Sequence, residues 1–191
     1  MIPTSGPVGE KLRRVSILLL DVDGVLTDGR ITYDDAGVET KRFHVQDGFG
    51  LRLLQDAGIA VGIVTGRSGA ALHHRCRDLG IDVVLDGVTD KAAALEAIRD
   101  REGHPLEGMA FAGDDWPDLP AMARAGVALA VPDAAPEVRE RADGVTDRPG
   151  GQGAVREMCE AILRAGNRWD VALNQFLPAD ETVTPAQDSR R

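Results

Sequence analysis

The feature that most constrains the fold is a short, mainly apolar run that ends on acidic residues. Val15–Leu20 is followed at once by Asp21, Asp23 and Gly24. A run this short, bounded by turn formers, predicts a buried strand. Successive strand residues alternate between faces, so Asp21 and Asp23 start on the same side, and Gly24 permits the turn after them. Two carboxylates at the end of a buried strand favour a site at the crevice of an open α/β sheet.

The rest of the chain alternates between strand and helix patterns. Short apolar runs at 59–64, 83–85, 109–112 and 127–131 predict further strands, with amphipathic stretches between them. This alternation predicts an α/β fold, with a doubly wound, Rossmann-like, mainly parallel sheet and helices on both faces. β-Forming residues on both sides of an Asp/Gly turn predict a protruding β-hairpin over residues 29–45, after the first strand.

The expected organisation is one domain with a segment at each end. The domain is expected over residues 15–168, after a loose lead-in at 1–14 and before a flexible tail at 169–191. The net charge of −9 argues against nucleic-acid binding. No stretch approaches the roughly 18 apolar residues that a membrane span needs. The only cysteines, Cys76 and Cys159, lie far apart, which fits a reducing compartment. We therefore expect a cytoplasmic protein with no nucleic-acid or membrane partner.

Functional side chains follow several of the predicted strands. Asp21 and Asp23 follow the first, Thr65 the second and Asp114 the fourth, and Lys91 begins a helix. The carboxyl ends of parallel strands share one edge of a sheet, so these residues are expected to converge. Carboxylates, a hydroxyl and an amine are the groups that phosphoryl transfer through a carboxylate requires.

Each of these residues has an expected role. Asp21 is the candidate nucleophile, and Asp23 is the candidate acid and base for the leaving group and the attacking water. Asp21, the backbone carbonyl of Asp23 and the carboxylate of Asp114 are the candidate Mg²⁺ ligands. Thr65 is expected to hydrogen-bond the phosphoryl oxygens, and Lys91 to neutralise their charge.

Two further acids support this set. Asp115 and Asp118 follow Asp114, and either is expected to orient Lys91 or the metal. Both also fit the first turn of a helix, as a cap or as an acid that complements the helix dipole. For Asp118 the two interpretations stay open.

Four segments in this order resemble the motifs of the haloacid dehalogenase-like phosphatases: Asp21–Asp28, Ile63–Arg67, Lys91 and Gly113–Asp118. Only 37 positions separate Asp28 from Thr65, and 26 separate Thr65 from Lys91. Neither interval holds a cap domain beyond the elements of the sheet. The resemblance is therefore to a capless subclass, whose crevice either accepts a macromolecule or borrows a lid from a neighbouring subunit.

From about Ile17 to Leu163 the chain is also similar to the 3-deoxy-D-manno-octulosonate 8-phosphate phosphatase family. The similarity lies in the hairpin and in 44–52, 65–67, 75–80 and 150–157. It implies a Mg²⁺-dependent phosphomonoesterase of lipopolysaccharide biosynthesis that acts through an aspartyl-phosphate. It also implies a homotetramer in which each active site is roofed by the neighbouring subunit. The implied contacts with the sugar acid are His44, Asp47, Gly48, Arg52, Gly66, Arg67 and Arg75.

Two departures leave the substrate open. His44 stands where that family usually has Asn, and Gln46 where it has Arg. A nonulosonate 9-phosphate or another small phosphate ester is the alternative, but phosphatases of nonulosonate 9-phosphates tend to carry an acid at the position of Arg67. Other classes are a signalling receiver, which the order of Thr65 and Lys91 before Asp114 disfavours, an inactive scaffold and a protein phosphatase. The run Gly150–Gly153 is either a flexible joint or a segment that reaches a neighbouring site.

Overall fold

The structure is a computed structural model that describes residues 2–178 and 180–183. Within these residues six parallel strands form one sheet, in the order β5-β4-β1-β6-β7-β8. Their bounds are β1 Ile17–Leu20, β4 Ala60–Val64, β5 Val83–Leu85, β6 Met109–Gly113, β7 Val127–Ala130 and β8 Gly144–Val145. The expected parallel sheet is confirmed, and the short strand β8 forms one of its edges.

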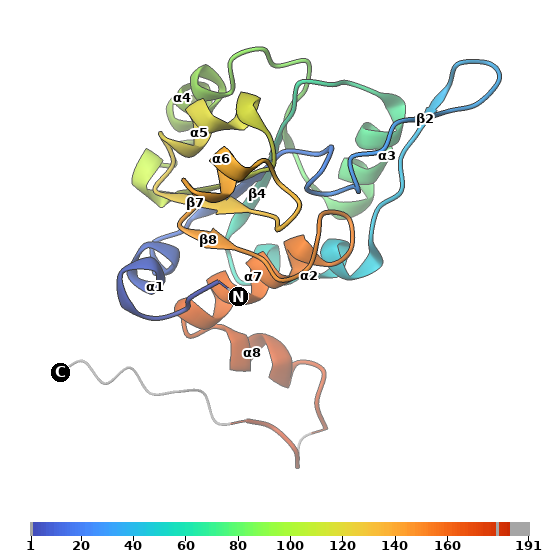
Figure 1. The fold of residues 1–191 in the computed structure, drawn as a ribbon. Helices are drawn as coiled ribbons and strands as arrows, with labels where there is room; N and C mark the ends of the chain where they lie inside the picture. Colours follow the sequence, from blue (N-terminus) through green and yellow to red (C-terminus); the bar gives the residue numbers. More distant parts are fainter. Residues whose placement is uncertain (1, 179, 184–191) are drawn as a thin grey trace.

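Helices cover both faces of the sheet, as expected for a doubly wound fold (Figure 1). One face carries α1, α2 and α7, of which α2 and α7 pack closely together, and the other carries α4 and α5. The helices are α1 Gly6–Arg13, α2 Val45–Asp56, α3 Ala70–Leu79, α4 Lys91–Glu102, α5 Leu119–Met122, α6 Pro136–Arg139, α7 Ala154–Ala165 and α8 Trp169–Asn174, with 3₁₀ turns η1 Leu106–Gly108 and η2 Trp116–Asp118. Among the described residues, no helix is both long enough and apolar enough to cross a membrane.

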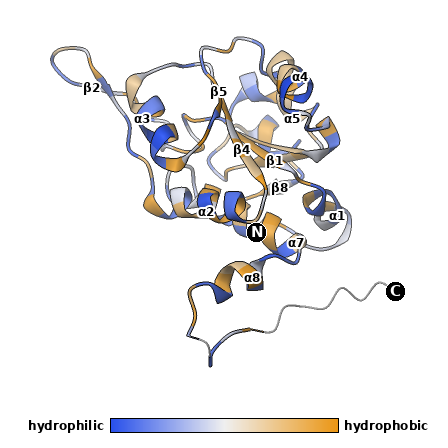
Figure 2. Ribbon diagram, turned by 180° about the vertical axis from the view of Figure 1, so that it is seen from behind, coloured by the Kyte–Doolittle hydropathy of each residue, from blue (hydrophilic) through white to orange (hydrophobic). Residues whose placement is uncertain are grey.

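The first strand, β1, lies at the centre of the sheet and of the core. It pairs with β4 on one side and β6 on the other, and every residue of Ile17–Leu20 is fully buried. Figure 2 shows hydrophobic residues gathered along these strands. The chain winds outward from β1 to β5 and then returns to β6, so the strand order reverses between β1 and β6. Ligands of open α/β sheets bind at such a reversal, next to the residues that follow these two strands.

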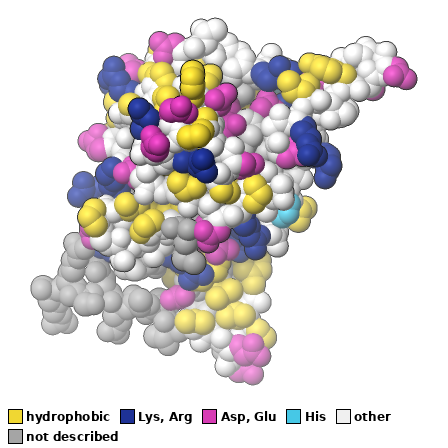
Figure 3. All heavy atoms as spheres, viewed as in Figure 1, with side chains coloured by type: hydrophobic (Ala, Val, Ile, Leu, Met, Phe, Trp, Pro, Cys, Tyr) yellow, Lys and Arg dark blue, Asp and Glu magenta, His cyan; other side chains and the backbone are white. Residues whose placement is uncertain are grey.

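The hairpin after β1 is shorter in its strands than expected. The hairpin is predicted over residues 29–45, whereas its strands are only β2 Thr32–Tyr33 and β3 Glu39–Thr40. The side chain of Asp34 closes the turn by accepting from the backbone N–H groups of Ala36 and Val38. Val45 instead begins α2. The hairpin projects from the body and carries hydrophobic and acidic side chains (Figure 3).

Each terminal segment contains a helix where the sequence predicts none. The loose lead-in predicted at 1–14 contains α1, which packs against α7 and β7 and buries Leu12. Pro7 lies in its first turn, where a missing N–H costs no helical hydrogen bond. The flexible tail predicted at 169–191 starts with α8, which packs on α7. The last part of that prediction, 184–191, lies outside the described residues.

Candidate active site

The end of β1 places Asp21 beside the end of β6. The backbone N–H of Asp21 donates to the carbonyl of Ala112 at 2.9 Å, which extends the ladder by one residue beyond β1. The Asp21 side chain is nearly buried. Gly24 has a φ of +97°, and a Cβ there would overlap the carboxylate of Asp114. Glycine is therefore required where the loop after β1 passes over Asp114.

Lys91, at the start of α4, lies between two carboxylates. Its Nζ is 2.9 Å from Asp21 Oδ1 and 2.6 Å from Asp118 Oδ1. Burial by itself lowers the pKa of Lys91, but the charges of Asp21 and Asp118 outweigh it and the pKa is raised. Lys91 is thus a fixed cation that directly contacts the candidate nucleophile.

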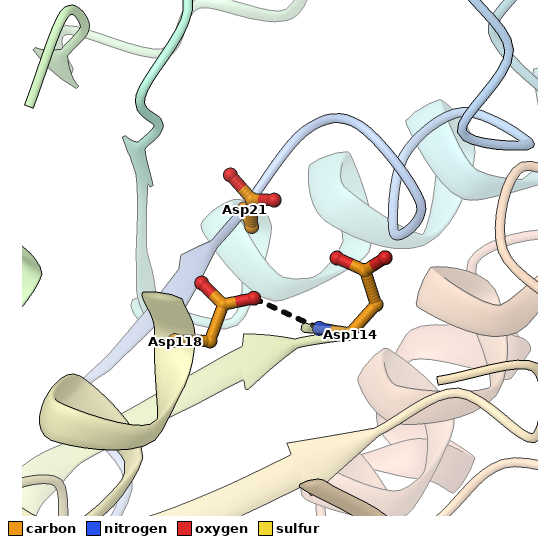
Figure 4. A group of neighbouring side chains, drawn as sticks. All are labelled: Asp21, Asp114 and Asp118. Carbon is orange, nitrogen blue, oxygen red and sulfur yellow. Dashed lines mark hydrogen bonds between the residues drawn. The ribbon is translucent and has the colours of Figure 1, made fainter. Parts of the chain in front are cut away.

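Asp118 holds this lysine and the turn after β6 at the same time. Its Oδ2 accepts from the backbone N–H of Asp114 at 2.9 Å (Figure 4). The same oxygen accepts from the N–H of Asp115 at 3.2 Å, while Oδ1 accepts from Lys91. Asp115 is exposed and caps η2 by accepting from the N–H of Trp116. Asp118 thus contacts Lys91 and also completes the capping box of η2.

Thr65 directly follows β4, which lies next to β1 in the sheet. It is buried, its N–H donates to Leu85 and its carbonyl accepts from Val88. The N–H of Arg67 lies 3.4 Å from its hydroxyl. Gly66 between them is exposed, and a Cβ there would make only an ordinary contact. The position of Thr65 at this edge agrees with the strand-end argument.

The acidic cluster fits a divalent cation. Oxygen atoms of Asp21, Asp114 and Asp118 lie within 4.8 Å of one another. Burial, with the nearby charges of Asp118 and Asp21, raises the pKa of Asp114 to about 7. Because both oxygens of Asp118 are already engaged, Asp21 and Asp114 are the side chains free to bind a cation. Carboxylate oxygens are the ligands that Mg²⁺ prefers.

The raised pKa of Asp114 leads to a testable dependence of stability on pH. Its ordinary value is 3.8, so between about pH 4 and pH 7 the folded protein holds a proton that the unfolded chain has lost. The metal-free protein is therefore expected to lose stability as pH rises through that window. Asp114→Asn should remove part of this loss. Thermal melting in EDTA and in Mg²⁺, at about pH 5 and about pH 8, measures it.

Magnesium should raise the melting temperature of the wild-type protein at the higher pH and have little effect on Asp114→Asn. Asp115→Asn, which changes an exposed neighbouring acid, is the matched control and should respond to magnesium like the wild type. An equal response of the Asp114 variant and the wild type would place the cation elsewhere.

The hairpin contributes a cation that the sequence analysis missed. Lys41 Nζ lies 2.5 Å from Asp23 Oδ1 and 2.7 Å from Glu39 Oε1, and its side chain is only 5% exposed. Arg67 binds the other oxygen of Glu39 at 2.5 Å and the hydroxyl of Tyr33 at 3.2 Å. The sequence does carry a signal for the ion pair of Lys41 with Glu39, because residues two positions apart share a face of an extended chain.

Only some of the residues implied to contact a sugar acid lie together. Arg75 donates to the carbonyl of His44 at 3.4 Å and stacks over Phe43, and a Cβ at Gly48 would overlap its guanidinium. His44 also lines a cleft of about 510 Å³, together with Asp28, Arg30, Arg42, Phe43, Gly151 and Gln152. Arg52 instead donates to the carbonyl of Asp78 at the end of α3.

The carboxylate of Asp47 is not free but accepts hydrogen bonds from the backbone of another segment. It is buried, and its oxygens accept from the N–H groups of Arg156 at 2.8 Å and Gly153 at 3.3 Å, at the start of α7. A residue remote in sequence thus caps α7, whose own N-cap is a glycine. This contact explains the acid without a substrate.

We expect Asp47→Ala to destabilise the protein by about 1–2 kcal/mol, the usual cost of losing a helix cap. Asp47→Asn, which keeps an acceptor, should lose less. Urea unfolding measures both, and KM measured well below the melting temperature should not change. A raised KM with unchanged stability would restore the substrate contact that the resemblance implied.

The run Gly150–Gly153 packs on the loop after β1. A Cβ at Gly150 would overlap the carbonyl of Gly24, and the N–H of Gly151 donates to Val25 at 3.0 Å. Gln46, a departure from the family pattern, accepts from Arg148 at 2.9 Å. Within this chain, the glycine run therefore supports the loop that carries Asp23.

The chain is similar to known proteins over most of its length. Residues 83–158 match the haloacid dehalogenase-like hydrolase family. The chain is 40% identical over 175 residues to 3-deoxy-D-manno-octulosonate 8-phosphate phosphatase of Escherichia coli strain K12, covering 92% of this chain and 93% of that protein. The chain belongs to the haloacid dehalogenase-like hydrolases.

The chain is also similar to solved structures of phosphatases. One is 3-deoxy-D-manno-octulosonate 8-phosphate phosphatase from Moraxella catarrhalis, in complex with magnesium, phosphate and the sugar acid KDO. It is 42% identical with a TM-score of 0.86, covering 88% of this chain and 97% of that one. Another is the cobalt-bound enzyme of the same activity from Haemophilus influenzae, 42% identical with a TM-score of 0.82, covering 84% and 94%.

Proposed function

We propose that this chain is a Mg²⁺-dependent phosphomonoesterase that hydrolyses a sugar-acid phosphate, 3-deoxy-D-manno-octulosonate 8-phosphate before others. The observation that carries the proposal is the buried cluster at the ends of β1 and β6, where Lys91 bridges Asp21 and Asp118 beside Asp114. The similarity to phosphatases of this substrate over most of the chain supports it.

In the first half of the reaction, an oxygen of Asp21 attacks phosphorus and the bond from phosphorus to the sugar oxygen breaks. Asp23 gives its proton to that oxygen as it leaves. Lys91 and Thr65 stabilise charge on the transferring group. Asp21, Asp114 and the carbonyl of Asp23 would hold Mg²⁺, which when bound neutralises charge between the nucleophile and the phosphate.

In the second half, water attacks phosphorus of the aspartyl-phosphate. Asp23, now a carboxylate, takes a proton from that water, and the bond from phosphorus to Asp21 breaks to release inorganic phosphate. Both carboxylates return to their starting protonation states, so no further reactant is needed.

The substrate assignment rests on charge as well as on similarity. A sugar-acid phosphate carries a carboxylate in addition to its phosphate, and Arg67 and Arg75 are cations suited to bind it. Within the described residues, Nδ1 of His44 is buried without a hydrogen bond. A hydroxyl of the sugar would satisfy that atom, which offers His44 a role where the family usually has Asn.

We also propose that the protein is a cytoplasmic homotetramer in which a neighbouring subunit roofs each active site. The hairpin exposes Ile31, Tyr33 and Val38, each at least half accessible to solvent. An isolated two-stranded hairpin is marginally stable, and exposed hydrophobic side chains on it suit a subunit interface. Light scattering after size exclusion should give four chains, and a monomer would contradict the assembly.

The function is tested by phosphate release from 3-deoxy-D-manno-octulosonate 8-phosphate, a nonulosonate 9-phosphate and simple sugar phosphates, in Mg²⁺ and in EDTA. The expected result is a kcat/KM for the octulosonate ester far above the others, lost in EDTA. A preference for the nonulosonate ester would replace the substrate but keep the reaction. No release from any ester would favour an inactive scaffold.

A further inference from the structure

The hairpin closes a ring of charges around Asp23. Going round it, Lys41 contacts Asp23 and Glu39, Glu39 contacts Arg67, and Arg67 Nε lies 3.8 Å from Asp23 Oδ2. Two basic side chains alternate with two carboxyl groups, drawn from three separate segments of the chain. The ring ties the hairpin and the loop after β4 to the loop that follows β1.

The two oxygens of Asp23 are not equivalent in this ring. Oδ1 accepts from Lys41 at 2.5 Å, whereas Oδ2 is buried and makes no hydrogen bond within the described part of the chain. A buried acceptor without a partner is costly, and such groups are found where a ligand supplies the missing hydrogen bond. Oδ2 is therefore the oxygen left available for a reacting group.

Lys41 is itself placed by more than its contact with Asp23. A lysine is rarely buried unless it is paired, and this one has Glu39 as its second partner. Glu39 lies in β3, and its other oxygen is held by Arg67. The Lys41 ammonium is thus fixed between the carboxyl groups of Asp23 and Glu39, which restricts the rotation of the Asp23 side chain.

We propose that Lys41 is a positioning residue that locks Oδ1 of Asp23, so that Oδ2 alone gives a proton to the leaving oxygen and later takes one from water. This inference rests on the proposed phosphatase function. Among the described residues, the ion-pair partners of Lys41 are Asp23 and Glu39 and not the nucleophile Asp21, so Lys41 acts through Asp23. The hairpin therefore supplies a part of the acid–base machinery from within its own chain.

The experiment compares two esters that differ in their need for an acid. The sugar phosphate has an alkoxide leaving group that must be protonated, whereas p-nitrophenyl phosphate has one that leaves unaided. Lys41→Met should lower kcat/KM for the sugar phosphate by about 10²-fold, the lower range for loss of a general acid. It should leave kcat/KM for p-nitrophenyl phosphate, which reports only on the first chemical step, nearly unchanged.

A double variant tests whether Lys41 acts through Asp23. Once Asp23→Asn is present, adding Lys41→Met should cause no further loss on the sugar phosphate, because the effects of coupled residues do not add. Lys11→Met is the matched control, since it removes a partly exposed lysine paired with Asp143 at 2.6 Å, and it should match the wild type on both esters.

Equal losses on both esters, or additive losses in the double variant, would overturn the role of Lys41. If a thermal melt shows that Lys41→Met is unfolded, the same two esters are compared with Lys41→Arg. It keeps the charge but not the geometry, so a smaller loss confined to the sugar phosphate supports the proposal, and no loss or an equal loss overturns it. A wild-type protein inactive on every ester would instead refute the proposed function.

Discussion

Asp21→Asn is expected to abolish phosphate release, with a fall in kcat of at least about 10⁴-fold, the scale seen when a nucleophile is removed. The amide has the shape of the carboxylate but lacks the charge and lone-pair density to attack phosphorus. It also removes one of the candidate cation ligands. Steady-state phosphate release in Mg²⁺ measures the effect.

The fold should survive this change. Lys91 keeps its contact with Asp118 at 2.6 Å, and one charge is lost from a cluster of three carboxylates. Asp100→Asn, an exposed acid on α4, is the control and should turn over like the wild type. Turnover near the wild-type rate in a folded Asp21→Asn protein would exclude Asp21 as the nucleophile.

Lys91→Met is expected to lose both turnover and stability. It leaves Asp21 and Asp118 as buried carboxylates without their shared cation, and breaking a buried pair in this way costs about 3–5 kcal/mol. In the wild-type protein the pKa of Lys91 is raised in the folded state. The stability that Lys91 contributes is therefore complete below its ordinary pKa of 10.5 and is lost as pH rises through the higher pKa of the folded state. Urea unfolding near neutral pH and phosphate release are the two measurements.

The ion pair of Lys11 with Asp143 at the surface is the control for the buried ion pairs of Lys91. Lys11→Met makes the same chemical change at a partly exposed site and should cost at most about 1 kcal/mol. Equal and small losses in both variants would mean that Lys91 does not hold the acidic cluster together.

The sheet and its catalytic edge could be predicted because both depend on local signals. Short apolar runs separated by helices leave few topologies, and right-handed crossovers then bring Asp21, Thr65 and Asp114 to one edge. Lys91 follows from the same logic, because a helix that starts at this edge begins with it. These residues needed no knowledge of side-chain packing.

The remaining parts depend on contacts between segments far apart in the sequence. The cap that Asp47 forms on α7 joins residues more than 100 positions apart, and the contact of Lys41 with Asp23 requires the path of the hairpin. Helix α1 does not follow from local signals, because glycine and proline suggest a loop there, whereas α1 packs against α7 and buries Leu12. Tertiary packing overrides local propensity in such segments.

The measurement that tests the central claim most directly is the capture of the phosphorylated protein. Enzyme mixed with ³²P-labelled substrate in Mg²⁺ is quenched in acid within one turnover, reduced with borohydride and mapped by mass spectrometry. We expect the label on the wild-type protein before reduction and homoserine at position 21 after it, with neither in Asp21→Asn. Phosphate release without any labelled protein, or a label on another residue, would contradict the assignment of Asp21 as the nucleophile.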